Sequence, residues 1–347
     1  MSSKMASINL VVFNGEKYIR HCLDAILAQT YPHELIELNI LDNNSTDATK
    51  QIIENWKLKI GNFKITFIKS NFNHGVWPGQ EELLKYTNGE YVLCLSVDVI
   101  LDRDFIANAV KRMESDEKIG ALQPKIYKFD IRDLEIENWK LRIGGAIDTC
   151  GFKIFRSRRI VNIGHGQEDT GQFNRYQEIF GVEGAAPLFR REALEDTKVN
   201  GELIDKDFFW YGDDLDLAWR MRLFGWKEVF DPEVIAWHDR QTTKTLRKSF
   251  GDFVKIRRSI PIKKRRLEWR NIRWTLIKND YIINTLRDLL AMLDREIQMV
   301  GYIIFFEPEV LLEIPRFLIM VPKMLARRRE IMKRATAKPE DIRKWFN

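Results

Sequence analysis

Short, largely apolar runs alternate with longer amphipathic stretches along the first 115 residues. The runs at 8–13 and 91–95 are typical of strands buried on both faces, and 35–41 and 64–68 predict two further strands. The amphipathic stretches predict helices over 16–29, 45–56, 80–86 and 104–114, with Ser45 as the cap of the second. This alternation predicts an α/β fold with a doubly wound, mostly parallel, Rossmann-like sheet.

Two of the predicted strands end in acidic residues. The second runs into Asp42-Asn43-Asn44-Ser45-Thr46-Asp47, and the fourth ends in Ser96-Val97-Asp98. Ligands of parallel α/β sheets bind beyond the carboxyl ends of the strands. We therefore expect Asp42 and Asp98 to lie in a binding site.

A further acidic turn lies between Ile204 and His238. Tyr211-Gly212-Asp213-Asp214 opens a predicted helix that ends at Gly225, and a strand over 227–231 then leads through Pro232 to an apolar run ending in His238. Taken alone, Asp213 and Asp214 are explained as a helix cap and a first-turn acid. His238 alone is explained as a hydrogen-bonded structural histidine.

The middle of the chain, 122–191, has a less regular pattern. Gly144-Gly145 and Cys150-Gly151 suggest a bent hairpin, and we expect the polar, glycine-rich loop 164–171 to be mobile. Small residues follow one another in 181–187. They permit another group to approach the backbone closely, or they reflect close internal packing.

The composition fits a globular protein of one large domain with an appendage, or of two domains. The three cysteines are far apart, which favours a reducing compartment. We recognise no signal peptide and no uncharged run near the ~18 residues that span a bilayer, since the apolar run 297–306 is closed by Glu296 and Glu307. We expect a cytoplasmic protein.

The positive charge is concentrated in the last third of the chain. Residues 239–347 hold 26 Lys/Arg and 13 Asp/Glu, a net charge of +13, whereas the rest has a net charge of −7. Apolar clusters within 281–321 are flanked by basic groups at 263–266 and 327–329. This favours helices lying on an anionic membrane surface. The alternative is a helical packing domain with a solvated basic face.

A nucleic-acid partner is a different class of explanation for the basic tail. Trp269, Trp274 and Trp345 would supply stacking and the basic groups phosphate contacts, with the body a nucleotide-binding module that has no transferase activity. That hypothesis leaves the acidic turn and His238 unexplained. We therefore expect no nucleic-acid partner.

Six motifs occur in a characteristic order. They are VVFNG at 11–15, DNNSTD at 42–47, LSVD at 95–98, GAAPLFRR at 184–191, DFFWYGDDLDLAWRMRLFGW at 207–226 and IAWH at 235–238. In these motifs the first 240 residues resemble the inverting glycosyltransferases of family 2, which have the GT-A fold. More narrowly they resemble rhamnosyltransferase-like members that act on lipid-linked saccharides. The resemblance implies a GT-A domain over 1–240, and 241–347 resembles the amphipathic, membrane-associating extension of that subfamily.

The resemblance also implies roles for individual residues. Nucleotide-sugar binding falls to Asn14, Asp42, Asn44, Ser96, Asp98 and Gly184, with Asp42 on the base. Asp98 and His238 would hold Mg²⁺ or Mn²⁺, although Ser96 stands where the family's DxD element has its first aspartate. Asp214 would be the catalytic base, and Asp213 would orient the acceptor or support the base.

These roles imply a metal-dependent, inverting sugar transfer. A carboxylate takes the proton of the attacking hydroxyl, and a cation offsets charge on the departing nucleoside diphosphate. The first expectation is rhamnose from dTDP-rhamnose, passed to a lipid-linked saccharide at the inner face of the membrane in cell-surface polysaccharide synthesis. UDP-linked hexoses and N-acetylhexosamines are the alternative donors.

Overall fold

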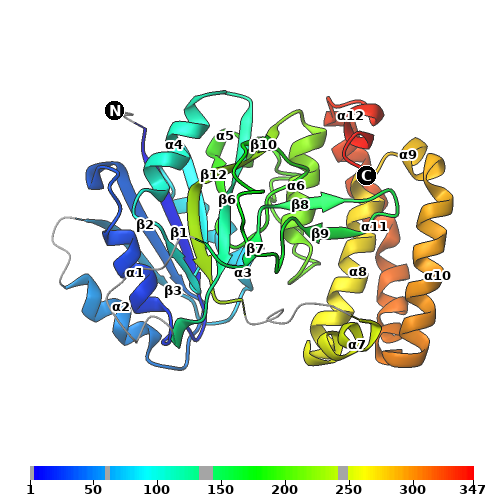
Figure 1. Cartoon of the computed structure of the whole chain (residues 1–347), viewed down its shortest axis with the longest axis horizontal. Helices are drawn as coiled ribbons and strands as arrows, with labels where there is room; N and C mark the ends of the chain where they lie inside the picture. Colours follow the sequence, from blue (N-terminus) through cyan, green and yellow to red (C-terminus); the bar gives the residue numbers. More distant parts are fainter. Residues whose placement is uncertain (1–3, 59–62, 133–143, 241–248) are drawn as a thin grey trace.

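A curled, mixed sheet organises the first two thirds of the chain. The computed structural model describes residues 4–58, 63–132, 144–240 and 249–347 (Figure 1). Four parallel strands occupy one half of the sheet in the order β3-β2-β1-β4. Their bounds are Ala6–Val12 for β1, Ile36–Asp42 for β2, Lys64–Lys69 for β3 and Tyr91–Ser96 for β4. All four were predicted from the apolar runs.

The other half of the sheet is mixed. Strand β11 lies antiparallel between β4 and β6, and β12 pairs parallel with β6. Shorter strands β5, β7 and β10 add to this half. The bounds are Val99–Leu101 for β5, Ile119–Lys128 for β6, Ile147–Thr149 for β7, Gln177–Glu178 for β10, Leu188–Arg190 for β11 and Lys227–His238 for β12. β12 is one strand whose register shifts between Asp231 and Ile235, around Pro232.

Helices cover both faces of the sheet, as a doubly wound fold requires. Helices α1, α2 and α4 share one apolar cluster with the strands, and α3, α5 and α6 share another on the opposite face. The bounds are Ile19–Leu27 for α1, Thr49–Lys57 for α2, Val76–Leu83 for α3, Phe105–Glu114 for α4, Arg191–Asp196 for α5 and Asp213–Leu223 for α6. Short 3₁₀ turns, His33–Leu35 and Leu84–Tyr86, precede β2 and follow α3.

Two predicted helix starts were wrong. Helix α2 begins at Thr49, because the Ser45 hydroxyl accepts the N–H of Asn14 instead of capping a helix. Helix α3 begins at Val76, four residues before the predicted start, because Pro78 is tolerated in its first turn. Helix α6 ends as predicted, with Gly225 in a left-handed conformation.

The irregular middle segment forms its hairpin after Gly151, by β8 (Phe152–Ile154) and β9 (Ile160–Asn162). The glycine-rich loop 164–171, for which we predicted mobility, contacts the sheet through a side chain. Asp169 accepts hydrogen bonds from Lys125 and Tyr127 at 2.8 and 2.6 Å.

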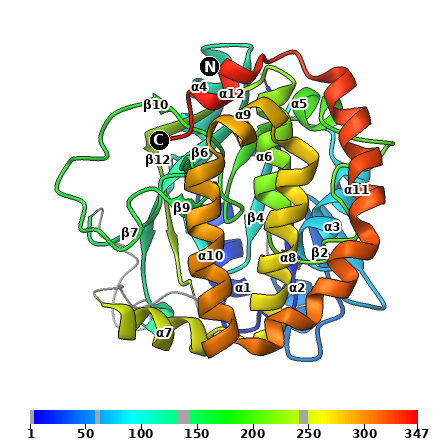
Figure 2. The same ribbon diagram turned by 90° about the vertical axis from the view of Figure 1, so that its right-hand side faces the viewer.

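The C-terminal third is helical, as predicted, but it shares a core with the sheet domain (Figures 1 and 2). Phe346 and Ile342 pack with Trp219 of α6, and Phe346 forms a backbone bridge to Ile154. The bounds are Phe250–Ser259 for α7, Ile262–Asn279 for α8, Ile282–Arg287 for α9, Leu289–Phe306 for α10, Ile314–Arg334 for α11 and Pro339–Arg343 for α12, with a 3₁₀ turn at Pro308–Glu313.

Most members of the basic clusters that flank the apolar tail have partners inside the protein. Arg265 and Arg266 form ion pairs with Glu307 and Glu313. Arg327 pairs with Asp205 and Asp207, and Arg328 donates to backbone carbonyls at the end of α8. These cations hold the helices together because each has a partner on another segment.

An exposed apolar face covers the helices farthest from the sheet, at the right-hand edge of Figure 1. We call it the α10 face. It comprises Ile282, Ile283, Leu286, Leu289, Leu290, Leu293, Ile297, Val300, Ile304, Phe305, Leu312, Ile314, Leu318, Ile319 and Leu325. Leu290 and Phe305 are 84% and 80% exposed. Within the described residues, the helices all lack the combined length and apolarity that a bilayer span requires.

Candidate active site

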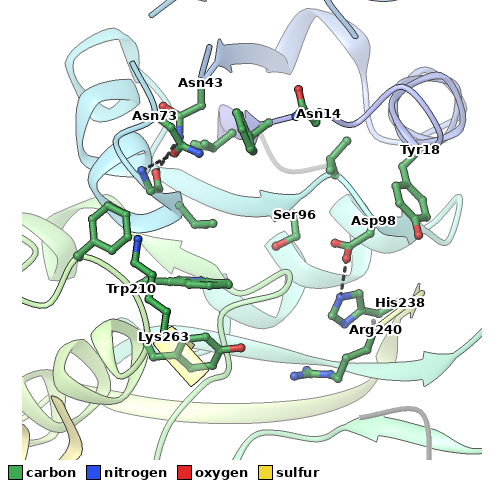
Figure 3. Close-up of a pocket in the computed structure, with 17 residues that line it drawn as sticks. Asn14, Tyr18, Asn43, Asn73, Ser96, Asp98, Trp210, His238, Arg240 and Lys263 are labelled. Carbon is green, nitrogen blue, oxygen red and sulfur yellow. Dashed lines mark hydrogen bonds and ion pairs between the residues drawn. The ribbon is translucent and has the colours of Figure 1, made fainter. Parts of the chain in front are cut away.

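A cavity of about 610 Å³ opens at the carboxyl ends of the central strands (Figure 3). The loops after β1, β2 and β4 form one side of it, and the end of β12 with the turn before α6 forms the other. Its lining residues are Val11, Phe13, Asn14, Tyr18, Asn43, Asn73, Gly75, Val76, Ser96, Val97, Asp98, Phe209, Trp210, Tyr211, His238, Arg240 and Lys263. The position agrees with the site expected at this edge of the sheet.

Asparagines tie together the loops that form one wall. The Asn14 side-chain oxygen accepts the Thr46 N–H at 2.8 Å, which joins the loop after β1 to the loop after β2. Asn43 donates to the Asn73 side chain at 2.9 Å and to the Gly75 carbonyl at 3.0 Å. The three loops therefore present a preformed amide-lined surface.

An aspartate–histidine pair lies at the far end of the cavity. His238 ends β12 and places its Nε2 3.3 Å from Oδ2 of Asp98, which follows β4. Its Nδ1 lies 2.8 Å from Oδ2 of Asp148, a fully buried residue of β7. A second carboxylate that holds one nitrogen of an imidazole fixes the ring so that the other nitrogen can face a cation.

The charges of this group are strongly coupled. Burial opposes a charge on His238, but Asp98 and Asp148 outweigh it and raise the His238 pKa to about 10. Burial also opposes ionisation of Asp98, and His238 outweighs that effect and lowers the Asp98 pKa. The carboxylate thus stays ionised at neutral pH, and a cation that bound His238 would have to displace its proton.

Arg240 extends this network toward the acidic turn. It donates to Asp148 at 2.7 and 3.0 Å and to Glu183 at 2.8 Å. Glu183 in turn is a neighbour of Asp214, whose charge it opposes. A continuous set of ionic contacts therefore runs from the Asp98–His238 pair to the residue beside the predicted base.

Asp214 lies beside the cavity in the first turn of α6. Burial and the nearby Glu183 raise its pKa to about 6, against the stabilisation of the ionised form that the helix dipole provides. A Cβ at Gly184 would come within 3.3 Å of Asp214 Oδ2 and of Trp77 Nε1. The small residue at 184 thus allows the backbone to approach the carboxylate closely.

Asp213 has a different environment from Asp214. It is 3% exposed, and burial together with the charge of Asp214 raises its pKa well above the usual value for aspartate. Its Oδ1 has no hydrogen-bond partner among the described residues. Burial and its acidic neighbour therefore both oppose the ionisation of Asp213.

An aromatic turn separates the acidic residues from the cavity mouth. Phe209 and Tyr211 have positive φ angles of 65° and 70°, a strained conformation for aromatic residues. Asn271 of α8 compensates for this strain, because its side chain donates to the carbonyls of residues 208, 210 and 211 at 3.1, 2.8 and 2.7 Å. The C-terminal helices thus shape the wall of the cavity.

The structure brings some of the predicted residues together and separates others. Asn14, Ser96, Asp98 and His238 line the cavity, whereas Asp42, Asn44, Gly184, Asp213 and Asp214 do not. Asp42 is 4% exposed and accepts the Ser45 N–H, so its visible role is to shape the loop. Asn44 is exposed with φ 72°.

Several residues of the site were missed by the sequence analysis. Asp148 and Glu183 contact Arg240 without lining the cavity, and they carried no signal because each contacts its partner from a distant part of the sequence. Arg240 lies two residues after the IAWH motif and could have been found from it. Lys263 was noted only as part of a basic cluster that flanks the apolar tail, but it lines the cavity (Figure 3).

The Asp98–His238 pair fits a divalent cation that completes its coordination with substrate oxygens. One carboxylate and one imidazole suit Mn²⁺ or Mg²⁺ when phosphate oxygens and waters supply the remaining ligands. Among the described residues there is no group of three or more His, Cys, Asp or Glu side chains that could hold a metal alone. A cation here would depend on the substrate for the rest of its ligands.

Comparison with known proteins places this geometry in a family. The model of the family described as glycosyl transferase family 2 matches residues 7–198. A poly-beta-1,6-N-acetyl-D-glucosamine synthase of Staphylococcus epidermidis is 26% identical over 233 residues, 67% of this chain and 49% of the relative. The synthase of Staphylococcus aureus is 26% identical over 230 residues. The chain spans about half the length of the curated relatives it matches.

Solved structures share the fold at low sequence identity. The mannosyltransferase PcManGT from Pyrobaculum calidifontis, in complex with GDP-Man and Mn²⁺, aligns with a TM-score of 0.54 at 16% identity, over 96% of this chain and 86% of that one. TarS 1–349 of S. aureus in complex with UDP-GlcNAc gives 0.53 at 14% identity, over 99% and 92%. These alignments confirm the predicted GT-A fold. Because the family model spans more than half of the sequence, the chain belongs to glycosyl transferase family 2 and is a glycosyltransferase.

Proposed function

We propose that this glycosyltransferase transfers an N-acetylhexosamine from a UDP-linked donor, with inversion at the anomeric carbon, to a saccharide acceptor in polysaccharide synthesis. The observation that carries the reaction type is the Asp98–His238 pair at one end of the cavity with Asp214 beside it. The curated relatives, named as N-acetylglucosamine polymer synthases, support this donor better than dTDP-rhamnose. The lipid-linked nature of the acceptor rests on the earlier resemblance alone.

The donor assignment predicts a specific stabilisation of the protein. UDP-N-acetylglucosamine at about 100 times its dissociation constant should stabilise the fold by ~2.7 kcal/mol, because only the folded state binds it. Thermal shift with UDP-N-acetylglucosamine, UDP-glucose, GDP-mannose and dTDP-rhamnose, each with and without Mn²⁺, measures this. Stabilisation by dTDP-rhamnose alone would instead support dTDP-rhamnose as the donor, as the sequence analysis first predicted.

Asp214 is the residue best placed to act as the general base. Its pKa of about 6 leaves it ionised at neutral pH yet basic enough to accept a proton from an attacking hydroxyl. The neighbour Asp213, whose ionisation is opposed by burial and by the charge of Asp214, can hold the acceptor or the base in position. A single direct attack of this kind inverts the anomeric centre.

Asp98 and His238 would hold the divalent cation, and Asp148 would orient His238. When bound, the cation offsets the charge that develops on the departing diphosphate. The asparagine-lined wall, Asn14, Asn43 and Asn73, is then left to position the nucleoside part of the donor.

We also propose that the protein docks on a membrane through the α10 face. Large apolar side chains exposed together on neighbouring helices mark an interaction site, and the helices that carry them lie in a strongly basic region. Since most arginines of the predicted basic clusters are paired internally, apolar insertion contributes more than charge. The cytoplasmic side of the membrane is the side that the sequence resemblance implies.

Point substitutions test docking better than a truncation, since the tail is part of the core. The triple variant Leu290→Gln, Ile297→Gln, Phe305→Gln should reduce co-sedimentation with phosphatidylglycerol vesicles by at least roughly a hundredfold, because each side chain contributes ~1.5–3 kcal/mol when buried. Leu58→Gln, at an 85% exposed leucine of the sheet domain, is the matched control. Unchanged vesicle binding by the triple variant would contradict the proposal. A wild-type protein that forms dimers and does not bind the vesicles would also contradict it.

A further inference from the structure

The first turn of α8 carries an arrangement of charge that works against the helix. Lys263, Lys264, Arg265 and Arg266 follow one another there without an acidic residue. The N-terminus of a helix has a partial positive charge, so cations in the first turn destabilise it. Within the described residues, α8 also has no side chain that caps this end. An anion bound at this turn would therefore stabilise the helix.

Two of these four cations have anionic partners and two do not. Arg265 lies 3.1 Å from Glu307, and Arg266 lies 2.8 Å from Glu313. Among the described residues, Lys263 and Lys264 contact aromatic rings and have no carboxylate within ion-pair distance. Lys264 is only 4% exposed, with Nζ 3.9 Å from the centre of the Tyr211 ring. Burial lowers the pKa of Lys264 to about 8, which means that burial destabilises its charged ammonium form.

The two lysines lie at the cavity already described. Lys263 lines it, with Nζ 4.9 Å from the Phe209 ring, and Figure 3 places it beside Trp210. Lys264 lies under Tyr211, another lining residue. The other cationic side chains of the cavity are already balanced, Arg240 by Asp148 and Glu183 and His238 by Asp98 and Asp148. Within the part of the chain that the structure describes, the cations at the cavity without a carboxylate partner are thus the two lysines.

We propose that the first turn of α8 is a phosphate-binding site at the mouth of the cavity, in which Lys263 and Lys264 bind a phosphoryl group of a substrate. The backbone amides of an uncapped helix N-terminus add donors to the two ammonium groups. The inference rests on the proposed function and deepens it. A phosphoryl group could come from the diphosphate of the nucleotide sugar or from the phosphate of a lipid-linked acceptor.

The site has a signature that a structural lysine would not give. Lys264→Met removes a buried cation that has no anionic partner, so the melting temperature should stay equal or rise. Phosphate binding should weaken in the same variant. A lysine needed for folding would show the opposite, a lower melting temperature with unchanged affinity in the folded fraction.

Isothermal titration of the full chain tests the site directly. Wild type, Lys263→Gln and Lys264→Met are titrated with UDP in the presence of Mg²⁺, and the UDP-saturated proteins are titrated with farnesyl diphosphate. Lys333→Gln, at a 69% exposed lysine of α11, is the matched control. We expect both variants to lose roughly tenfold or more in affinity for one probe, as for a lost charge-assisted hydrogen bond.

The two titrations identify the source of the phosphate. Weaker UDP binding assigns the site to the donor, and unchanged UDP binding with weaker farnesyl diphosphate binding assigns it to the acceptor. Affinities within twofold of wild type for both probes would overturn the site while leaving the proposed function intact. A wild-type protein that bound neither diphosphate would overturn both.

Discussion

Replacing Asp214 with asparagine is expected to lower kcat by about 10²–10⁴, the usual contribution of a general base. The amide keeps the shape of the side chain and removes its basicity. Donor affinity should stay nearly unchanged, because Asp214 lies beside the cavity and does not line it. Initial-rate kinetics with a parallel titration of UDP-sugar binding separate the two effects.

The pH profile gives an independent check on this assignment. The wild-type rate should rise with pH through an apparent pKa near 6, since only the ionised Asp214 accepts a proton. The folded-state pKa lies above the unfolded value, so ionisation between about pH 4 and 6 opposes folding. Asp214→Asn should therefore be no less stable than wild type at pH 7, and its inactivity would not reflect unfolding.

Asp213→Asn is the matched control for that experiment. Burial and the charge of Asp214 oppose the ionisation of Asp213, and Asp213 is not the residue that takes the proton, so the amide should reduce the rate less than Asp214→Asn. An inactive Asp213→Asn together with an active Asp214→Asn would exchange the two roles. Normal turnover by both would reduce the acidic turn to the start of a helix.

Removal of divalent cations is expected to abolish turnover, and Asp98→Ala should not recover at excess metal. Asp98 and His238 are the protein groups placed to hold the cation, and the loss of either leaves one ligand. Asp148→Asn keeps both ligands but weakens the hold on the His238 ring, so metal affinity should fall by about 10–100-fold. Activity titrated against Mn²⁺ measures both changes.

The matched control for the metal experiment is Asp169→Asn, at a carboxylate that pairs with Lys125 outside the cavity. It should require no more Mn²⁺ than wild type. Full activity of wild type in a chelator would show that the Asp98–His238 pair is an ion pair and not a metal site. An Asp148→Asn variant with wild-type Mn²⁺ dependence would show that Asp148 does not support metal binding by His238.

The sequence predicted the parallel half of the sheet because each strand there is a short, largely apolar run with an amphipathic helix after it. It did not predict that β11 enters antiparallel between β4 and β6, since a three-residue strand has too short a pattern. The predicted site residues at strand ends, Ser96, Asp98 and His238, were brought together for the same topological reason.

Long-range side-chain contacts account for most of what was missed. Asp148 meets His238 from 90 residues away, and Lys278 of α8 pairs with Asp216 of α6 from 62 residues away. No local pattern encodes such pairings. For the same reason Lys263 was noted only as part of a basic cluster that flanks the apolar tail, although folding places it in the wall of the cavity.

The stereochemistry of the first product tests the central claim most directly. Wild-type enzyme is incubated with UDP-N-acetylglucosamine and Mg²⁺, which unlike Mn²⁺ leaves the proton spectrum sharp, and slow donor hydrolysis is followed by NMR. We predict that the first free sugar has the anomeric configuration opposite to that of the donor and equilibrates afterwards. A first product that retains the donor's configuration would contradict direct displacement assisted by Asp214.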